Sequence, residues 1–148
     1  MTNAPIESFL PHRKPMLLLD RLIDGDPSFA RSAIAVSEQD LFFEEGMGLP
    51  AWALLEYFAQ TAALIGGLEA EAGAKAVPQG FLLGTRKLEC EVSHIPAGVE
   101  LELEAKLEFA DGAGMSAYHC RTLNPEYPVT CVLSVYVPPA DDGAPSSD

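Results

Sequence analysis

Residues 51–65 read AWALLEYFAQTAALI, and this stretch decides the fold. Pro50 fits the first position of a helix, helix-forming residues continue to about Ala72, and Gly73 is suited to a C-terminal stop. The sequence therefore predicts one long helix, the only one in the chain. Within the quoted stretch Glu56 is the only residue with a formal charge, so this part of the helix carries a single carboxylate on an apolar cylinder.

The hydrophobic period changes after Pro78. Residues 99–109, VELELEAKLEF, alternate strictly, so that Val99 and Phe109 belong to a predicted buried face and the glutamates to a wet face. Such alternation indicates an antiparallel sheet packed on one side, with the helix as its packing partner. We predict an α+β fold of five or six strands around one central helix. The expected strands are 16–23, 29–36, 80–93, 99–109, 115–123 and 129–137, with a short helix at 5–10 and a turn at 24–27.

Composition excludes several classes of protein. The chain has 148 residues and a net charge of −13, so its surface repels nucleic acid phosphates. No apolar run approaches the ~20 residues that a membrane span needs, and the N-terminus lacks the pattern of a signal peptide, so a cytoplasmic location is expected. The three cysteines, Cys90, Cys120 and Cys131, match no zinc or redox motif and are interpreted as buried small hydrophobes.

Glu56 and Gln60 share one face of the predicted helix and form a small polar spot. A buried carboxylate has to be paired, protonated or reached by water, so Glu56 is a candidate for acid–base chemistry. Pairing with a buried arginine, or exposure at a subunit edge, would explain it equally well. At the helix start, the amides of Ala51 and Trp52 lack intrahelical acceptors and are expected to bind a carbonyl oxygen of a substrate.

Two segments resemble a known family. LPHRKPMLLLDRLID (Leu10 to Asp24) and LPAWALLEYFAQTAALIGG (Leu49 to Gly67) resemble the N-terminal and central-helix patterns of FabZ/FabA-like 3-hydroxyacyl-[acyl-carrier-protein] dehydratases. The resemblance implies the hotdog fold, in which a curved antiparallel sheet wraps one helix and two protomers form the active sites. It predicts a single hotdog domain over residues 1–137 and leaves 138–148, which are proline-rich, small and acidic, as a disordered tail.

The resemblance also assigns roles. Glu56 matches the family's catalytic acidic residue, Ala51 the glycine whose amide holds the thioester carbonyl, and Gln60 a glutamine beside the carboxylate. The family's catalytic histidine lies in a G-H-F-P motif, and here Phe42-Phe43 leads into EEGMGLP without a histidine. His12 is the replacement candidate for the base, although family members carry an equivalent histidine in addition to the catalytic one.

The loop EEGMGLP (residues 44–50) is shorter than the family's loop. It resembles that of a divergent branch, the ApeP-type dehydratase-like proteins of aryl polyene clusters, for which a FabZ-like hotdog companion is expected. The chain would then work as a homodimer or as a heterodimer with that companion. The substrate would be a thioester on acyl carrier protein or CoA, and no cofactor or metal is expected. Two basic pairs are predicted to contact the carrier protein or its phosphates: Arg13 with Lys14, and Arg86 with Lys87. His94 is expected in an exposed turn, and His119 within a strand.

Three functions remain open from the sequence. The first is a dehydratase of fatty-acid or polyene biosynthesis in which Glu56 is the general acid and His12 the base. The second is a noncatalytic hotdog subunit of a heterodimeric dehydratase, favoured by the missing G-H-F-P. The third is an acyl thioesterase in which Glu56 activates water. The type of acyl chain, the choice between carrier protein and CoA, and the oligomeric state beyond a dimer are not legible in the sequence.

Overall fold

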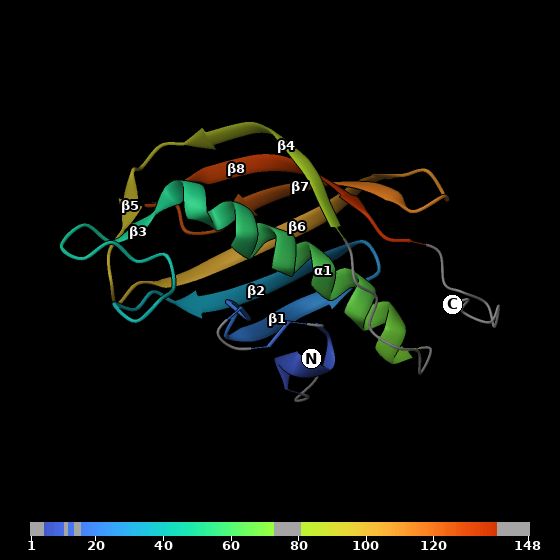
Figure 1. Ribbon diagram of the computed structural model, residues 1–148, viewed down its shortest axis with the longest axis horizontal. Helices are drawn as coiled ribbons and strands as arrows, with labels where there is room; N and C mark the ends of the chain where they lie inside the picture. Colours follow the sequence, from blue (N-terminus) through green and yellow to red (C-terminus); the bar gives the residue numbers. More distant parts are fainter. Residues whose placement is uncertain (1–4, 11, 14–15, 73–80, 139–148) are drawn as a thin grey trace, which may run out of the picture.

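The computed structural model describes residues 5–10, 12–13, 16–72 and 81–138, with the side chains of residues 69–72 and 81 left outside this description. Within these ranges one long helix lies across one face of an antiparallel sheet (Figure 1). The elements in chain order are η1 (Ile6–Ser8), β1 (Arg21–Asp26), β2 (Phe29–Ala35), β3 (Leu49–Pro50), η2 (Ala51–Ala53), α1 (Leu54–Ala72), β4 (Phe81–Cys90), β5 (His94–Ile95), β6 (Glu100–Ala110), β7 (Met115–Thr122) and β8 (Val129–Tyr136).

The main sheet has six strands in the order β1-β2-β6-β7-β8-β4, and every pairing in it is antiparallel. A second, two-stranded ladder joins β3 to β5 beside the start of the helix. Strand β4 follows the helix in the chain but pairs with the last strand, β8. At this end the sheet curls over α1 (Figure 1). The predicted α+β architecture with a sheet wrapped on one helix is confirmed.

The core lies between α1 and the inner face of the sheet. The helix contributes Tyr57 and Phe58, and the sheet contributes Leu101, Leu103 and Leu133, all of them at most 1% exposed. Complete burial of one such side chain contributes about 1.5–3 kcal/mol relative to leaving it in water. Apolar residues occur around much of the helix because the sheet covers one side and the N-terminal segment packs on it at Gly67 and Gln60.

The alternation predicted for residues 99–109 holds in the middle of β6 and fails at its end. Leu101, Leu103 and Ala105 are buried, whereas Phe109 is 59% exposed. The pairing of β6 with β7 shifts register between Leu107 and Phe109, and such an irregularity interrupts the alternation of side chains across a strand. The prediction that Phe109 faces the core is therefore wrong.

Glu104 was assigned to the wet face of β6 but is only 6% exposed. It receives hydrogen bonds from Arg31 Nε at 2.9 Å and from Arg121 Nε at 2.8 Å. The two arginines come from the neighbouring strands β2 and β7, at positions directly opposite Glu104. They cover the carboxylate and tie three strands together.

The predicted strand at 16–23 is wrong in its first half. Strand β1 begins at Arg21. Residues 16–19 precede the strand, and Asp20 already donates its N–H to the Ala33 carbonyl of β2 at 3.0 Å. Gln60 of the helix binds the backbone here, taking the N–H of Leu18 and donating to the carbonyl of Met16. These side-chain bonds replace part of a strand ladder. The turn after β1 is shorter than predicted, because β1 continues to Asp26.

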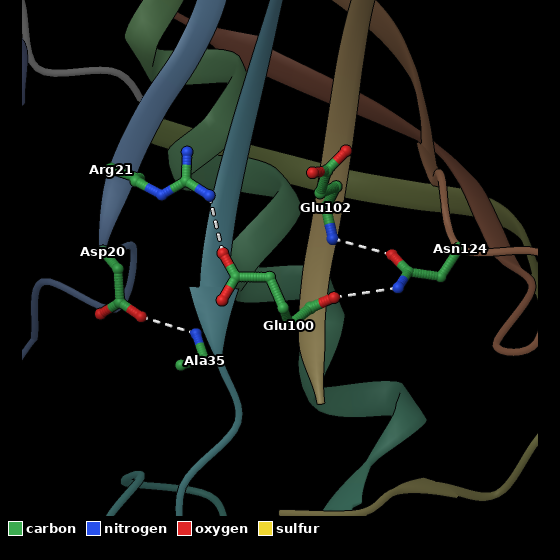
Figure 2. A network of polar contacts seen from close by, with 6 residues as sticks. All are labelled: Asp20, Arg21, Ala35, Glu100, Glu102 and Asn124. Carbon is green, nitrogen blue, oxygen red and sulfur yellow. Dashed lines mark hydrogen bonds and ion pairs between the residues drawn. The ribbon is translucent and has the colours of Figure 1, made fainter. Parts of the chain in front are cut away.

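Polar side chains also fasten the ends of β1, β2 and β6 (Figure 2). Asp20 accepts a hydrogen bond from the Ala35 amide at 2.6 Å, and Arg21 pairs with Glu100 at 2.7 Å. The Asn124 side chain receives the Glu102 amide, at 2.9 Å, and donates to the Glu100 carbonyl. The sheet edge next to the N-terminal segment is therefore held by specific contacts.

The remaining sequence predictions divide as follows. The helix begins with a 3-10 turn at Ala51–Ala53 and continues as α1 to Ala72, whereas the proposed stop at Gly73 lies outside the described residues. The predicted helix at 5–10 is only the 3-10 turn η1. Cys120 and Cys131 are buried as predicted, but Cys90 is exposed, because it lies on the edge strand β4. Of the predicted tail, residues 139–148 lie outside the described residues.

Candidate active site

A cavity of about 150 Å³ lies between α1 and the strands β4, β7 and β8. It is mostly apolar, and its polar groups include the side chains of His12 and Glu56. From the helix it takes residues at helical spacing, so that one face of α1 forms one wall. The lining residues are His12, Glu56, Ala59, Ala62, Ala63, Gly66, Leu82, Tyr118, Val135 and Val137.

His12 and Glu56 are brought together although they are far apart in the sequence. Burial lowers the pKa of His12 below its usual value, the charge of Glu56 opposes this shift, and the charge of Arg13 adds to it. The lowered pKa keeps the imidazole neutral at neutral pH, which is the form that can accept a proton. Its Nδ1 atom is buried and has no hydrogen-bond partner among the described residues.

Gln60 lies one turn after Glu56 and is completely buried. Its Nε2 donates to Glu56 Oε2 at 3.2 Å and to the Met16 carbonyl at 2.7 Å, while its Oε1 accepts the Leu18 amide at 2.9 Å. Both the donor and the acceptor of this amide are thus engaged within the protein, and Gln60 is absent from the cavity wall. The expected contact of Gln60 with substrate is not what this arrangement provides; the residue instead orients Glu56.

The helix start differs from the prediction. The Ala51 amide donates to the Ser93 carbonyl at 2.9 Å, so it is not available to a thioester carbonyl. The Ala51 N–H has this acceptor outside the helix, in the loop before β5, so the predicted contact of Ala51 with a substrate carbonyl is wrong. The Trp52 side chain is 55% exposed and packs edge-on against Phe42, with ring centroids 6.0 Å apart. Neither Ala51 nor Trp52 lines the cavity.

The two basic pairs lie in different surroundings. Arg13 donates to the backbone carbonyls of Leu10 and His12 and so fixes the shape of its own loop, while Lys14 lies outside the described residues. Arg86 and Lys87 are exposed on β4. Lys87 has a φ of 56°, and the register of β4 against β8 shifts between Arg86 and Glu89. These two cations are accessible to a partner.

The other two histidines do not reach the cavity wall. His94 is not an exposed turn residue as predicted, since its side chain is 18% exposed. Its Nε2 lies 2.8 Å from Glu44 Oε1 and its Nδ1 lies 3.0 Å from Ser93 Oγ. His119 is a strand residue, on β7 opposite Lys106. Among the histidines and carboxylates of the described residues, His12 and Glu56 are thus the two that line the cavity.

Within the described part of the chain, no three histidine, cysteine or carboxylate side chains are grouped so that they could hold a metal ion. Among those same residues no helix is long and apolar enough to cross a membrane.

The sequence did not single out the walls contributed by β7 and β8. Tyr118 and Val135 line the cavity from these strands, and Tyr118 lies two positions from the buried Cys120. The available signal was the alternation of the strands, which places both residues on the helix side of the sheet. Alternation indicates which face a side chain occupies, but it does not indicate where helix and sheet separate enough to leave a cavity.

The fold and the cavity define the class of protein. An antiparallel sheet curled around one helix is the hotdog fold, and three comparisons agree with it. The chain matches the dehydratase heterocomplex ApeI:P from Xenorhabdus doucetiae with a TM-score of 0.85 and 25% identity, covering 93% of each chain. A hypothetical thioesterase protein with coenzyme A from Streptococcus pneumoniae shares the fold alone, with a TM-score of 0.62, 9% identity, and 79% of this chain and 86% of that chain covered.

Sequence comparison gives the family. Residues 4–145 match the ApeP-like family model, described as ApeP dehydratase, and the chain belongs to this family. The 3-hydroxyacyl-[acyl-carrier-protein] dehydratase FabZ of Acetivibrio thermocellus is 29% identical over 120 residues, which cover 77% of this chain and 80% of the relative. The predicted resemblance to FabZ-like dehydratases and to the ApeP branch is confirmed, and the chain is a dehydratase of this hotdog type.

Proposed function

We propose that this chain removes water from 3-hydroxyacyl thioesters carried by acyl carrier protein, with His12 as base and Glu56 as acid. The observation that carries the proposal is that these two side chains line one mostly apolar cavity. The FabZ relative, a 3-hydroxyacyl-[acyl-carrier-protein] dehydratase, supports the substrate class. The neutral state of His12 favours its assignment as base.

The proposed reaction is an elimination. Neutral His12 takes the proton from the carbon next to the thioester carbonyl, and the electron pair of that C–H bond forms the C=C bond. The C–O bond at the β-carbon breaks, and protonated Glu56 gives its proton to the departing hydroxyl, which leaves as water. Transfer of the proton from His12 to Glu56 restores both groups. Each proton transfer of this kind contributes about 10²–10⁴-fold in rate.

The α-proton becomes acidic enough only if the thioester carbonyl is polarised. Ala51 is excluded as the donor because its amide is bonded to Ser93. We assign the role to the next amide along the helix start, that of Trp52. Trp52 does not line the acyl cavity, so this assignment places the carbonyl outside it, at the helix start.

The apolar part of the cavity suits the acyl chain. Its helix wall consists of alanines and Gly66, and the opposite wall includes Tyr118 and Val135. From Glu56 to Gly66 the helix rises roughly 15 Å at 1.5 Å per residue. A chain that enters beside Glu56 would extend along this wall, so a fatty or polyene acyl group fits the cavity better than a compact polar group.

A partner subunit is part of the proposal. The related structure is a heterocomplex of ApeI and ApeP, and β4 leaves one edge of the six-stranded sheet open to a second subunit. We propose a hotdog dimer, either of two copies or with a FabZ-like companion, paired along β4. Exposed Arg86 and Lys87 on the same strand would attract the acidic carrier protein or the phosphates of its prosthetic group.

The test is dehydration of 3-hydroxyacyl carrier-protein thioesters by the purified chain, alone and mixed with a FabZ-like companion. We expect Glu56→Gln and His12→Asn each to lower kcat by about 10²-fold or more, whereas Glu45→Gln on an exposed loop should not change it. If neither the chain nor the mixture dehydrates the substrate, the proposal is wrong. If the mixture keeps full activity with Glu56→Gln, this chain is the noncatalytic subunit.

Hydrolysis of the thioester is measured in the same assay. Release of free thiol that depends on Glu56 would indicate a thioesterase. The likeness to the Streptococcus pneumoniae protein concerns the fold alone and does not favour that outcome.

A further inference from the structure

The segment that carries His12 is attached to helix α1 at two points. At the first, the backbone of Phe9 touches the helix at Gly67, where a Cβ atom would collide with the Phe9 carbonyl oxygen. At the second, Gln60 binds the backbone of Met16 and Leu18. His12 lies between these attachments, so both of them determine where its ring stands at the cavity.

The Gln60 amide can adopt only one orientation. The Leu18 N–H can only donate and the Met16 carbonyl can only accept, so Oε1 of Gln60 must face Leu18 and its Nε2 must face Met16. The second proton on Nε2 is then directed to Glu56 Oε2, at 3.2 Å. Without the docked segment, the amide would be free to rotate and present its oxygen to the carboxylate instead.

We infer that Gln60 is a positioning residue which makes the state of Glu56 depend on docking of the N-terminal segment. This inference rests on the proposed function, because it concerns the acid of that reaction. The donated N–H occupies Oε2, so Oε1 is left for the substrate hydroxyl. The segment that brings His12 to the cavity thereby also orients Glu56, and both reacting groups are assembled together.

A purely structural role for Gln60 would predict something different. A buried amide that only fastens the segment should change its packing and stability when replaced, with no effect on how Glu56 titrates. A relay from the segment to Glu56 should change both. The titration of the Glu56 carboxyl is therefore the deciding measurement, and it requires no substrate.

The experiment follows the side-chain carboxyl signal of Glu56 by NMR across pH in the full chain, together with amide exchange at Leu18. In Gln60→Met the N–H donor is lost, so the Glu56 midpoint should move to higher pH than in the wild type, and Leu18 should exchange at least about tenfold faster. Thr61→Val is the matched control. Thr61 is the next residue and equally buried, but its hydroxyl bonds Ser32 and the Tyr57 carbonyl, so neither readout should move.

A remote variant tests the same relay without changing any group near Glu56. Gly67→Ala should release Phe9 from the helix, and the loosened segment should raise both the Leu18 exchange rate and the Glu56 midpoint. This variant also decides the question if Gln60→Met fails to fold. An unchanged Glu56 midpoint in a folded Gln60→Met protein, or in Gly67→Ala with Phe9 released, would overturn the inference.

The two proposals fail in distinguishable ways. If the wild-type chain and its mixture with the companion show no dehydration, the proposed function is wrong, while the titration still decides whether Gln60 relays docking to Glu56. If dehydration is found and Glu56 titrates identically in Gln60→Met, the relay is wrong and the proposed function stands.

Discussion

The sequence motif nominated His12 as the base, and its place in the cavity beside Glu56 supports that assignment. Burial lowers its pKa from the usual 6.5, the Glu56 charge raises it in part, and Arg13 lowers it. A base is lost on protonation, so kcat/KM should fall as the pH falls through this lowered pKa, and activity should persist below pH 6.5. Rate measurements between about pH 4 and pH 8 test this, with activity corrected for unfolding.

The effect of the Arg13 charge on the pKa of His12 allows a second test with the same pH profile. Arg13→Gln removes a positive charge beside His12, so the acidic limb of the profile should move to higher pH. A limb that stays in place in this variant, or that lies above pH 6.5 in the wild type, would assign the base to another residue.

Glu104 is a residue-scale determinant of stability. Burial favours its neutral form, but the hydrogen bonds and charges of Arg121 and Arg31 outweigh burial, and its folded-state pKa lies below the usual 4.5. A depressed acid pKa contributes stability that is present above the unfolded-state value and is lost as the pH falls through the folded-state value. Chain stability should therefore decrease below about pH 4.5 in part through this group.

Substitution of Glu104 measures how much its carboxylate contributes to the free energy of unfolding. Glu104→Gln should cost about 1–3 kcal/mol in the free energy of unfolding at pH 7, since two partly exposed guanidinium groups lose their anion. Glu100→Gln removes the exposed pair with Arg21, whose side chains are 56% and 52% exposed, and should cost less than about 1 kcal/mol. Urea unfolding at pH 7 and pH 4 measures both, and an equal effect at the two sites would contradict the argument.

At the scale of elements, the sequence predicted those parts of the fold that a repeating period determines. The helix, β2 and the inner face of β6 follow from their periods of 3.6 and 2, and the resemblance to the dehydratases located Glu56 and His12 at one site. The period could not predict the backbone at residues 16–19, because its partner is the Gln60 side chain, which lies 44 residues from Met16 in the sequence. Neither could it predict the Ser93 carbonyl at Ala51, a contact made by tertiary packing alone.

The face of helix α1 that lines the cavity is predicted to limit the length of the acyl chain. Gly66 lines the cavity two to three turns beyond Glu56, on the same helix face. In Gly66→Leu the added side chain should fill the space that a long acyl chain occupies. We expect kcat/KM to fall by about tenfold or more for long chains and by less than about twofold for short ones, because burial of each CH₂ contributes about 0.8 kcal/mol.

Gly66→Ala is the control for this experiment, since it changes helix propensity in the same direction with little added volume. Kinetics with a series of chain lengths measure the effect. A uniform loss over all chain lengths in Gly66→Leu would show that the acyl chain does not extend along this face.

At the scale of the whole molecule, the charge of −13 makes the few accessible cations informative. Arg86 and Lys87 lie in the middle of β4, at the open edge of the sheet. If two identical chains paired antiparallel through the middle of β4, four positive charges would meet near the two-fold axis, and like charges at such an edge oppose self-pairing. A companion with carboxylates on its edge strand would instead be attracted, which agrees with the heterodimer alternative of the proposed function.

Mixing wild type with Arg86→Glu tests where the chains meet. If β4 is the interface, the reversed charge in one chain attracts the positive charge in the other, and mixed dimers should exceed their statistical share at low salt. The expected gain is roughly 0.2–1 kcal/mol and should disappear near 1 M salt. Lys106→Glu makes an equal change in net charge at an exposed position of the interior strand β6, so mixed dimers should keep their statistical share. Native mass spectrometry of the mixtures counts the species. Identical dimer distributions for the two variants would place the interface away from β4, whereas the absence of dimers in both mixtures would agree with pairing to a companion alone.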